Sequence, residues 1–324
     1  VSLGGHIKFI IRLPIKFRDL VEASIYAHYP DAQIAEIEDY TKTVPRYYPN
    51  ATHLMWATEF TLVRHEAYPL RTYPAFEDKL SQEFKDPMSS ALEDLSRLQE
   101  GEQAWFQIII IPIHQKEWPK HSQHIVDKIL GRGHAPKPPL WERVLMAPLD
   151  LLSAMVDFLT TPGGEHADKK EENEGPPSFM EMPTHEKAIL EGIGLKMTKI
   201  GYEVKMRFVY VARREVYFPS RVMNGFIGAI KQFNTVDLNA LKPDTRHWTR
   251  VSYDWHDWRL NYRRRTLMRA YCGRSESRGL YPFILNIEEL ASLWHFPVMQ
   301  VKAPLVKKTE AKRAEPPFRL PVVK

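Results

Sequence analysis

The run Trp105–Ile113, WFQIIIIPI, limits the fold more than any other stretch, because almost every residue in it is apolar. A strand that is apolar on both sides leaves no face for solvent, so we expect it inside a sheet that is covered on both faces. Short β-rich or alternating runs predict further strands. These lie at residues 6–13, 33–40, 53–65 and 202–212.

Helical patterns alternate with these strands, at residues 17–29, 86–101, 184–199 and 219–233. The clearest is 86–101, in which Asp86 is the expected N-cap, Pro87 the first helical residue and Gly101 the terminator. Because the helix–strand–helix order recurs, we predict an α+β fold of two similar units, with a ferredoxin-like arrangement as the template for each. The first unit would span residues 1–115 and the second 184–297.

The segment between these units, residues 116–183, breaks the pattern. We expect a linker, an apolar helix at 140–160 and a charged, disordered loop at 162–178. The apolar helix has three interpretations: burial against its own domain, contact with a membrane surface, or docking of a partner helix. For the last two, the candidate contact residues are Trp141, Leu145, Leu152 and Phe158.

Composition and missing motifs exclude several functions. Hydrophobic residues make up 44% and charged residues 26%, as in ordinary globular proteins, and no uncharged apolar run reaches the ~18 residues of a membrane span. The single cysteine, Cys272, excludes an internal disulfide, and His121 with His124 supplies too few ligands for zinc. No phosphate-binding loop or catalytic motif is present. We therefore predict no catalytic, cofactor-binding or metal-binding residue.

An arginine- and aromatic-rich segment, residues 248–278, is a candidate nucleic-acid surface. Arginine forks bind phosphates and aromatic faces stack on unpaired bases. The alternative is a solvated basic face whose aromatic rings belong to the core or to a protein interface. The candidate residues are Arg259, Tyr262, Arg263, Arg264, Arg265, Arg269, Tyr271 and Arg274.

The sequence FILNIEELASLWHFP, residues 283–297, predicts a short helix with a well-defined N-terminal cap. Asn286 and Glu289 have the spacing of a capping box, with Leu285 and Leu290 as its hydrophobic staple, and Pro297 ends the helix. We interpret residues 286–296 as a docking helix. Its key residues are Asn286, Glu289, Leu290, Leu293, His295 and Pro297. Residues 298–324 then form an extended, basic, proline-rich connector.

These last residues resemble the segment that precedes the ATPase module in bacterial conjugative-transfer, type IV secretion-like ATPases. That segment has a helix of the pattern L-N-x-E-E-L-A-x-L-x-H-x-P and a connector that ends in P-x-x-L-P. Residues 285–297 match the helix, and Pro317, Leu320 and Pro321 match the connector, whereas Ser292 and Trp294 depart from the commoner Thr and Tyr or Phe. YPDAQIAEIEDYT and the stretch from Tyr68 to Pro112 also resemble the region upstream of those motors.

The resemblance implies a non-catalytic accessory or assembly region of a DNA-translocating ATPase. Such a region would lie in the bacterial cytoplasm, with the inner face of the membrane as a further location. ATP and Mg²⁺ would bind only in a downstream module, and this chain would belong to a longer protein. The implied partners are that ATPase module, a second copy of the chain, DNA, and a membrane surface or membrane protein. A single-strand nucleic-acid-binding module at 248–278 and a membrane-surface adaptor at 140–160 are the alternatives.

Overall fold

One antiparallel sheet organises the part of the chain that the structure describes, and its strands come from both halves of the sequence. The structure is a computed structural model that describes residues 1–77, 86–114, 118–130, 183–250 and 256–297. Its residues divide into unit 1, Val1–Ile113 with Lys199–Lys324, and unit 2, His114–Thr198. The α+β class is confirmed.

The sheet of unit 1 has seven strands in the order β2-β1-β4-β5-β3-β6, with β7 also paired to β5. β4 lies along one side of β5 for its whole length, while β3 and then β7 share the other side. Their bounds are β1 Ser2–Leu3, β2 His6–Ile7, β3 His53–Leu62, β4 Glu102–Pro112, β5 Gly201–Arg213, β6 Leu241–Pro243 and β7 Phe283–Asn286.

The strands therefore do not form the two separate units, 1–115 and 184–297, that the sequence pattern predicted. Glu102–Pro112 and His53–Phe60 both pair with β5, so the two segments share one sheet and one core. Within the described ranges, neither half builds a ferredoxin-like sheet of its own. The alternation of apolar residues identifies a strand but does not identify its partner, and this is why the sequence pattern could not reveal the shared sheet.

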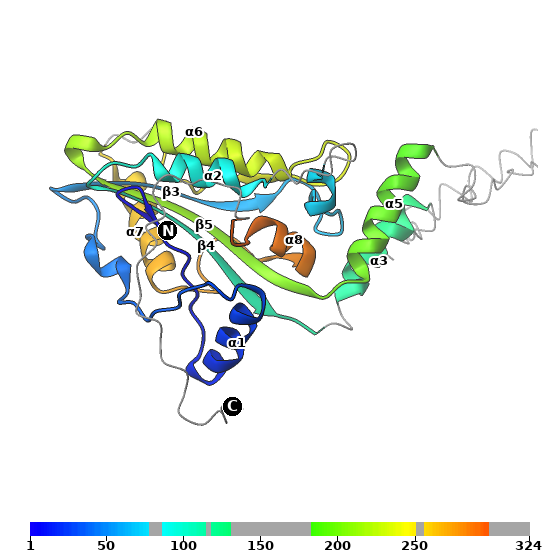
Figure 1. Cartoon of the computed structure of the whole chain (residues 1–324). Coiled ribbons are helices and arrows are strands. Elements are labelled where there is room, and N and C mark those ends of the chain that lie inside the picture. The colour runs from blue at the N-terminus through cyan, green and yellow to red at the C-terminus, as the bar shows by residue number, and fades with distance from the viewer. Residues whose placement is uncertain (78–85, 115–117, 131–182, 251–255, 298–324) are drawn as a thin grey trace, which may run out of the picture. The chain divides into compact units, whose positions relative to one another are not determined.

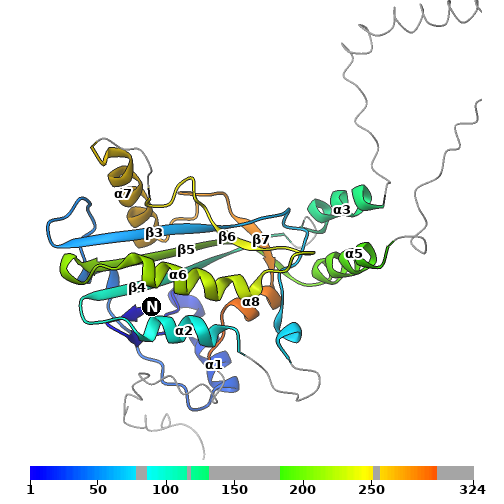
Figure 2. The ribbon, with the colours of Figure 1, turned by 90° about the horizontal axis from the view of Figure 1, so that it is seen from above.

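Helices cover both faces of this sheet (Figure 1). Figure 2 shows α2 and α6 running beside each other above β4 and β5, and α7 packs on the opposite face. The helices of unit 1 are α1 Arg18–His28, α2 Met88–Ser96, α6 Pro219–Ile230, α7 Trp258–Cys272 and α8 Ile287–Leu293. Short 3-10 helices lie at Ile15–Phe17, Tyr40–Thr43, Tyr73–Phe76, Arg214–Val216 and Lys231–Phe233.

Alternation along β5 sends its side chains to two different cores. Met206, Phe208 and Tyr210 join the larger core with α2, α6 and α8, in which Phe208 stacks on Phe226 with ring centroids 4.0 Å apart. Val209 and Val211 join the smaller core with α7 on the other face. Each face thus receives every second residue, as the pleat of a strand requires.

Three strand predictions need correction. The run at 6–13 forms only the two-residue strand β2, and residues 33–40 contain no strand. The strand predicted at 105–113 is present as β4, but it is covered on both faces only near its start: Trp105 is buried while Ile110 is 50% exposed. The residues of an apolar run are buried only where another element lies over them.

Unit 2 contains α3, Trp118–Ile129, and α5, Thr184–Met197, which pack against each other. Trp118 and Ile193 are buried, and the Lys196 ammonium lies 5.9 Å from the Trp118 ring centroid. The helix predicted at 184–199 thus exists, but it belongs with the insert and not with the second half of the sheet. Pro183 holds the N-cap position of α5, and this position makes no side-chain capping bond.

Candidate functional site

The capping box of α8 is present and also joins α8 to a distant loop. The Asn286 side chain accepts the Glu289 N–H at 2.8 Å, and the Glu289 carboxylate accepts the Asn286 N–H at 2.8 Å. The second carboxylate oxygen of Glu289 accepts the Leu70 N–H at 2.7 Å. Glu289 is 1% exposed, so one buried carboxylate fixes both the start of α8 and the loop at Leu70.

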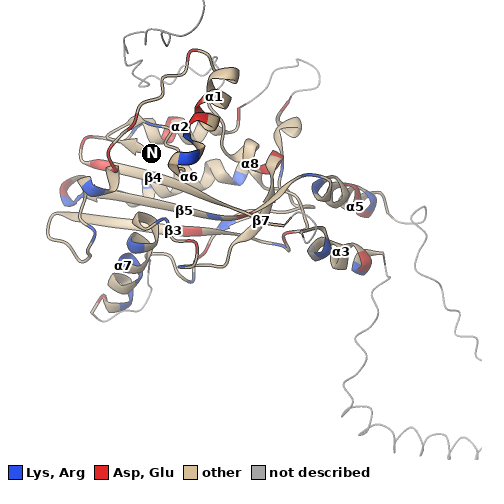
Figure 3. Ribbon diagram, turned by 90° about the horizontal axis from the view of Figure 1, so that it is seen from below, with Lys and Arg blue, Asp and Glu red and all other residues tan. Residues whose placement is uncertain are grey.

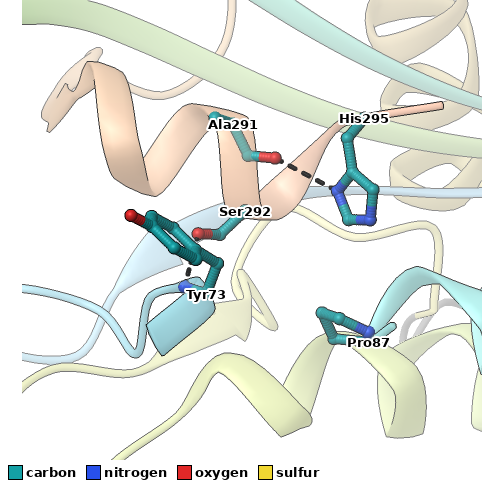
Figure 4. Close-up of a pocket in the computed structure, with 5 residues that line it drawn as sticks. All are labelled: Tyr73, Pro87, Ala291, Ser292 and His295. Atoms are coloured by element: carbon teal, nitrogen blue, oxygen red, sulfur yellow. Dashed lines mark hydrogen bonds between the residues drawn. The ribbon is translucent and has the colours of Figure 1, made fainter. Parts of the chain in front are cut away.

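Ser292 of α8 and His295, just after it, make further contacts, and Figure 4 shows the bonds from Tyr73 to Ser292 and between His295 and Ala291. The Ser292 hydroxyl accepts the Tyr73 N–H at 2.9 Å and donates to the Glu288 carbonyl. His295 Nε2 lies 2.9 Å from the Asp86 carboxylate at the start of α2. Between these contacts is a hollow of about 320 Å³, lined by Tyr73, Pro87, Ala291, Ser292 and His295.

Both ring nitrogens of His295 face acceptors. Nδ1 is 3.1 Å from the Ala291 carbonyl, and Nε2 faces the Asp86 carboxylate, so only the protonated ring donates at both positions. Burial alone would lower the pKa of His295, but the hydrogen bond and charge of Asp86 and the backbone carbonyls together raise it above the ordinary 6.5. The protonated form of His295 therefore stabilises the joint between α8 and α2.

The helix predicted over residues 286–296 is shorter in the structure: α8 ends at Leu293, and Trp294 is already extended, so Pro297 does not end it. Leu290 and Leu293 are buried in the larger core, together with Leu285 of β7. Trp294 and Phe296, just after α8, make edge or tilted contacts with Phe9. Pro297 is partly buried and is the last residue described in this segment. The structure thus brings the motif residues 286–297 together as one joint, which we call the α8 joint.

The arginine and aromatic candidates of α7 divide into two groups, and the first is used inside the fold. Arg263 donates to the carbonyls of Trp248 and Arg250, and Arg264 donates to that of Met55. Arg265 donates to the Tyr48 carbonyl at 2.6 Å.

Two further candidates also have partners within the fold. Arg274 donates to Asp39 at 2.8 Å, and this hydrogen bond holds the pKa of Asp39 well below its usual range. The Tyr271 ring is buried, and its hydroxyl lies 2.8 Å from that of Tyr40. Five of the eight candidates therefore support the structure by holding loops against α7.

The second group, Arg259, Tyr262 and Arg269, is exposed. Tyr262 is 71% exposed, and the Arg269 guanidinium lies 6.0 Å from the Tyr47 ring centroid. Arg269 opens onto a hollow of about 490 Å³ that the sequence did not indicate. We call it the arginine hollow; it is lined by Arg46, Tyr47, Met268, Arg269, Cys272, Gly273, Ser275 and Arg278. Burial raises the pKa of the Cys272 thiol.

A buried arginine that the sequence analysis did not single out anchors the loop after α7. Arg207 of β5 is 1% exposed and donates to Glu59 of β3 at 2.9 Å. Its other guanidinium nitrogens donate to the side chain of Gln107 and to three backbone carbonyls. Those carbonyls belong to Ala270, Ser275 and Arg278. Gly279, at φ +88°, passes so close to Glu59 that an added Cβ would collide with its carboxylate oxygens.

The remaining predicted contact residues, Trp141, Leu145, Leu152 and Phe158, lie outside the described residues, as does the connector 298–324. Within the described ranges, no three His, Cys, Asp or Glu side chains come together as metal ligands. Nor does any helix in those ranges combine the length and apolarity needed to cross a bilayer.

The fold and its two sites define an α+β domain whose seven-stranded antiparallel sheet carries a joint at α8 and an arginine hollow at α7. The chain belongs to the family described as Domain of unknown function (DUF8128), which it matches over residues 5–309. The matched stretch contains both α7 and α8. No curated protein and no solved structure matches the chain.

Proposed function

We propose that this chain is a non-catalytic accessory and assembly region of a conjugation-type, type IV secretion-like DNA-translocating ATPase. It would act as a platform in the cytoplasm, at or near the inner face of the membrane, and couple mechanically to a motor module that follows it. The resemblance of residues 285–297 and of Pro317, Leu320 and Pro321 to the segment before such motors supports the proposal.

The observation that carries the proposal is the anchoring of the α8 joint. α8 continues directly from β7, which pairs with the central strand β5. Glu289 and Ser292 bind the loop from Leu70 to Tyr73, and His295 binds Asp86. A force on the chain after Pro297 would therefore reach the middle of the sheet and not merely a loose end.

The first test is the activity of the 324-residue chain and of the reading frame that contains it. We expect the chain alone to hydrolyse no ATP and the frame to encode a phosphate-binding loop within a few dozen residues of Lys324. ATP turnover that stays with the chain at constant specific activity through successive purification steps would overturn the proposal. A frame without such a loop would do the same.

The second test asks whether the α8 joint couples platform and motor. In the full-length protein, Glu289→Ala should lower DNA-stimulated kcat for ATP while the KM for ATP stays unchanged, because in this proposal ATP binds only in the downstream module. Glu288→Ala is the matched control, since Glu288 is on the same helix and pairs only with Lys199 among the ion pairs described. Equal kcat values for the two variants would contradict mechanical coupling.

A further inference from the structure

The arginine hollow holds three cations and no carboxylate. Arg46, Arg269 and Arg278 line it, and the other lining residues are neutral. Its volume of about 490 Å³ is within the range of pockets that bind small ligands. Like charges in one hollow repel each other, so an anion in that place would be stabilised by all three.

These arginines also differ from the rest of the cluster in having their charge available. Arg207 and Arg274 pair with carboxylates, whereas no ion pair is found for the three hollow arginines among the described residues. All three are exposed. A planar guanidinium fork binds phosphate through two parallel hydrogen bonds, so phosphate is the anion that this set suits best.

Exposed aromatic rings extend from the hollow along α7. Tyr47 is at the hollow and is 67% exposed. Tyr262 and Trp258, 71% and 76% exposed, stand seven and eleven residues before Arg269, which places them on the same side of the helix. Figure 3 shows Lys and Arg positions along the same helix. At 1.5 Å per residue, the stretch from Trp258 to Arg269 is about 16 Å long.

We infer that this surface binds single-stranded nucleic acid, with a backbone phosphate in the arginine hollow and unpaired bases on Tyr262 and Trp258. Every base has a face that can stack on an aromatic ring, and the backbone supplies a phosphate at each step. A free phosphate group would use the hollow but not the rings along α7. This inference does not depend on the motor-platform proposal.

The experiment measures fluorescence anisotropy of a labelled oligo-dT of about 12 nucleotides, a length within the range of single-strand binding sites. The three-fold variant R46A/R269A/R278A should bind at least about tenfold more weakly than the natural chain. Its salt dependence, log K against log salt, should be shallower by about 0.7, because the single phosphate contact in the hollow is lost. W258A/Y262A should also weaken binding, since the bases lose two stacking faces.

The matched control is R12A/R213A/K231A, which removes the same charge from three exposed cations outside the hollow, and for these no ion pair is found among the described residues. It should bind as the natural chain does. Thermal melts check that each variant folds. If the three-fold variant does not fold, Arg46→Glu, a single change in an exposed loop residue, replaces it in the experiment.

Three outcomes would overturn the inference. The first is unchanged affinity in R46A/R269A/R278A or in Arg46→Glu. The second is an equal loss in the control, which would indicate a general charge effect. The third is competition by millimolar inorganic phosphate or by a mononucleotide with no effect of W258A/Y262A, which would make the hollow a site for a free phosphate group instead.

Discussion

The α7 and α8 helices, both rich in polar residues and close in sequence, use those residues in opposite ways. In α8 the polar side chains are the anchor: Glu289 and Ser292 are buried and accept backbone N–H groups from a distant loop. In α7 the arginines divide, and Arg264 and Arg265 donate to carbonyls of other segments while Arg259 and Arg269 stay exposed. A carboxylate accepts hydrogen bonds from backbone N–H groups that lack a partner, whereas a guanidinium donates to backbone carbonyls that lack one.

This difference teaches that charge alone does not mark a binding surface. A buried backbone group needs a partner, and a long charged side chain within reach can provide one. A charged residue is therefore a better candidate for ligand binding when it is not already the hydrogen-bond partner of such a backbone group. On α7 and its surroundings, that rule selects the arginine hollow over the arginines at 263–265.

The largest expected effect comes from removing the arginine that supports the loop after α7. Arg207→Ala leaves the buried Glu59 carboxylate without its cation, and we expect unfolding to become easier by about 3–5 kcal/mol. Urea titration followed by far-UV circular dichroism measures the loss. The Glu59→Leu/Arg207→Met double variant should recover only part of it, because the carbonyls of Ala270, Ser275 and Arg278 still lack their donor. A loss under about 1 kcal/mol in Arg207→Ala would contradict the anchoring role.

A smaller loss is expected when the anchor of α8 is removed. Glu289→Ala leaves the N–H groups of Asn286 and Leu70 without acceptors, which should cost about 2–4 kcal/mol in the free energy of unfolding. The same urea titration measures it. Glu288→Ala, one position earlier, removes only a partly exposed ion pair with Lys199 and should cost less than about 1 kcal/mol. If the two variants were equally stable, α8 would not be held by its carboxylate.

The smallest effect is a pH dependence of the same joint. The folded-state pKa of His295 is raised above 6.5, so its contribution to stability is complete below pH 6.5 and is lost as pH rises through the folded value. The free energy of unfolding of the natural chain, relative to His295→Gln, should therefore fall from pH 6 towards alkaline pH. Urea titrations of both proteins at several pH values give this difference. A difference that is constant with pH would show that the histidine charge does not hold α8.

Several elements follow from the sequence because their signals are local. The capping box of Asn286 and Glu289 was predictable, since its partners are three residues apart. The strand β5 and the middle of helix α2 were predictable for a similar reason, because alternation and a 3.6-residue stripe are properties of neighbouring residues. The ends of α2 were predicted wrongly: Pro87 and not Asp86 is the N-cap, and the helix ends at Ser96 and not near Gly101.

Long-range partners decided the rest. The sequence presents Lys205 and Arg207 as the polar side of an alternating strand, yet both are buried beneath the loop that follows α7. Arg264 reaches a carbonyl 209 residues away, and Arg46 meets Arg269 at the same hollow from another part of the chain. Local chemistry therefore determined the elements and their caps. Only the tertiary structure decided which strands share the sheet and which arginines remain exposed, because both depend on contacts between residues far apart in the sequence.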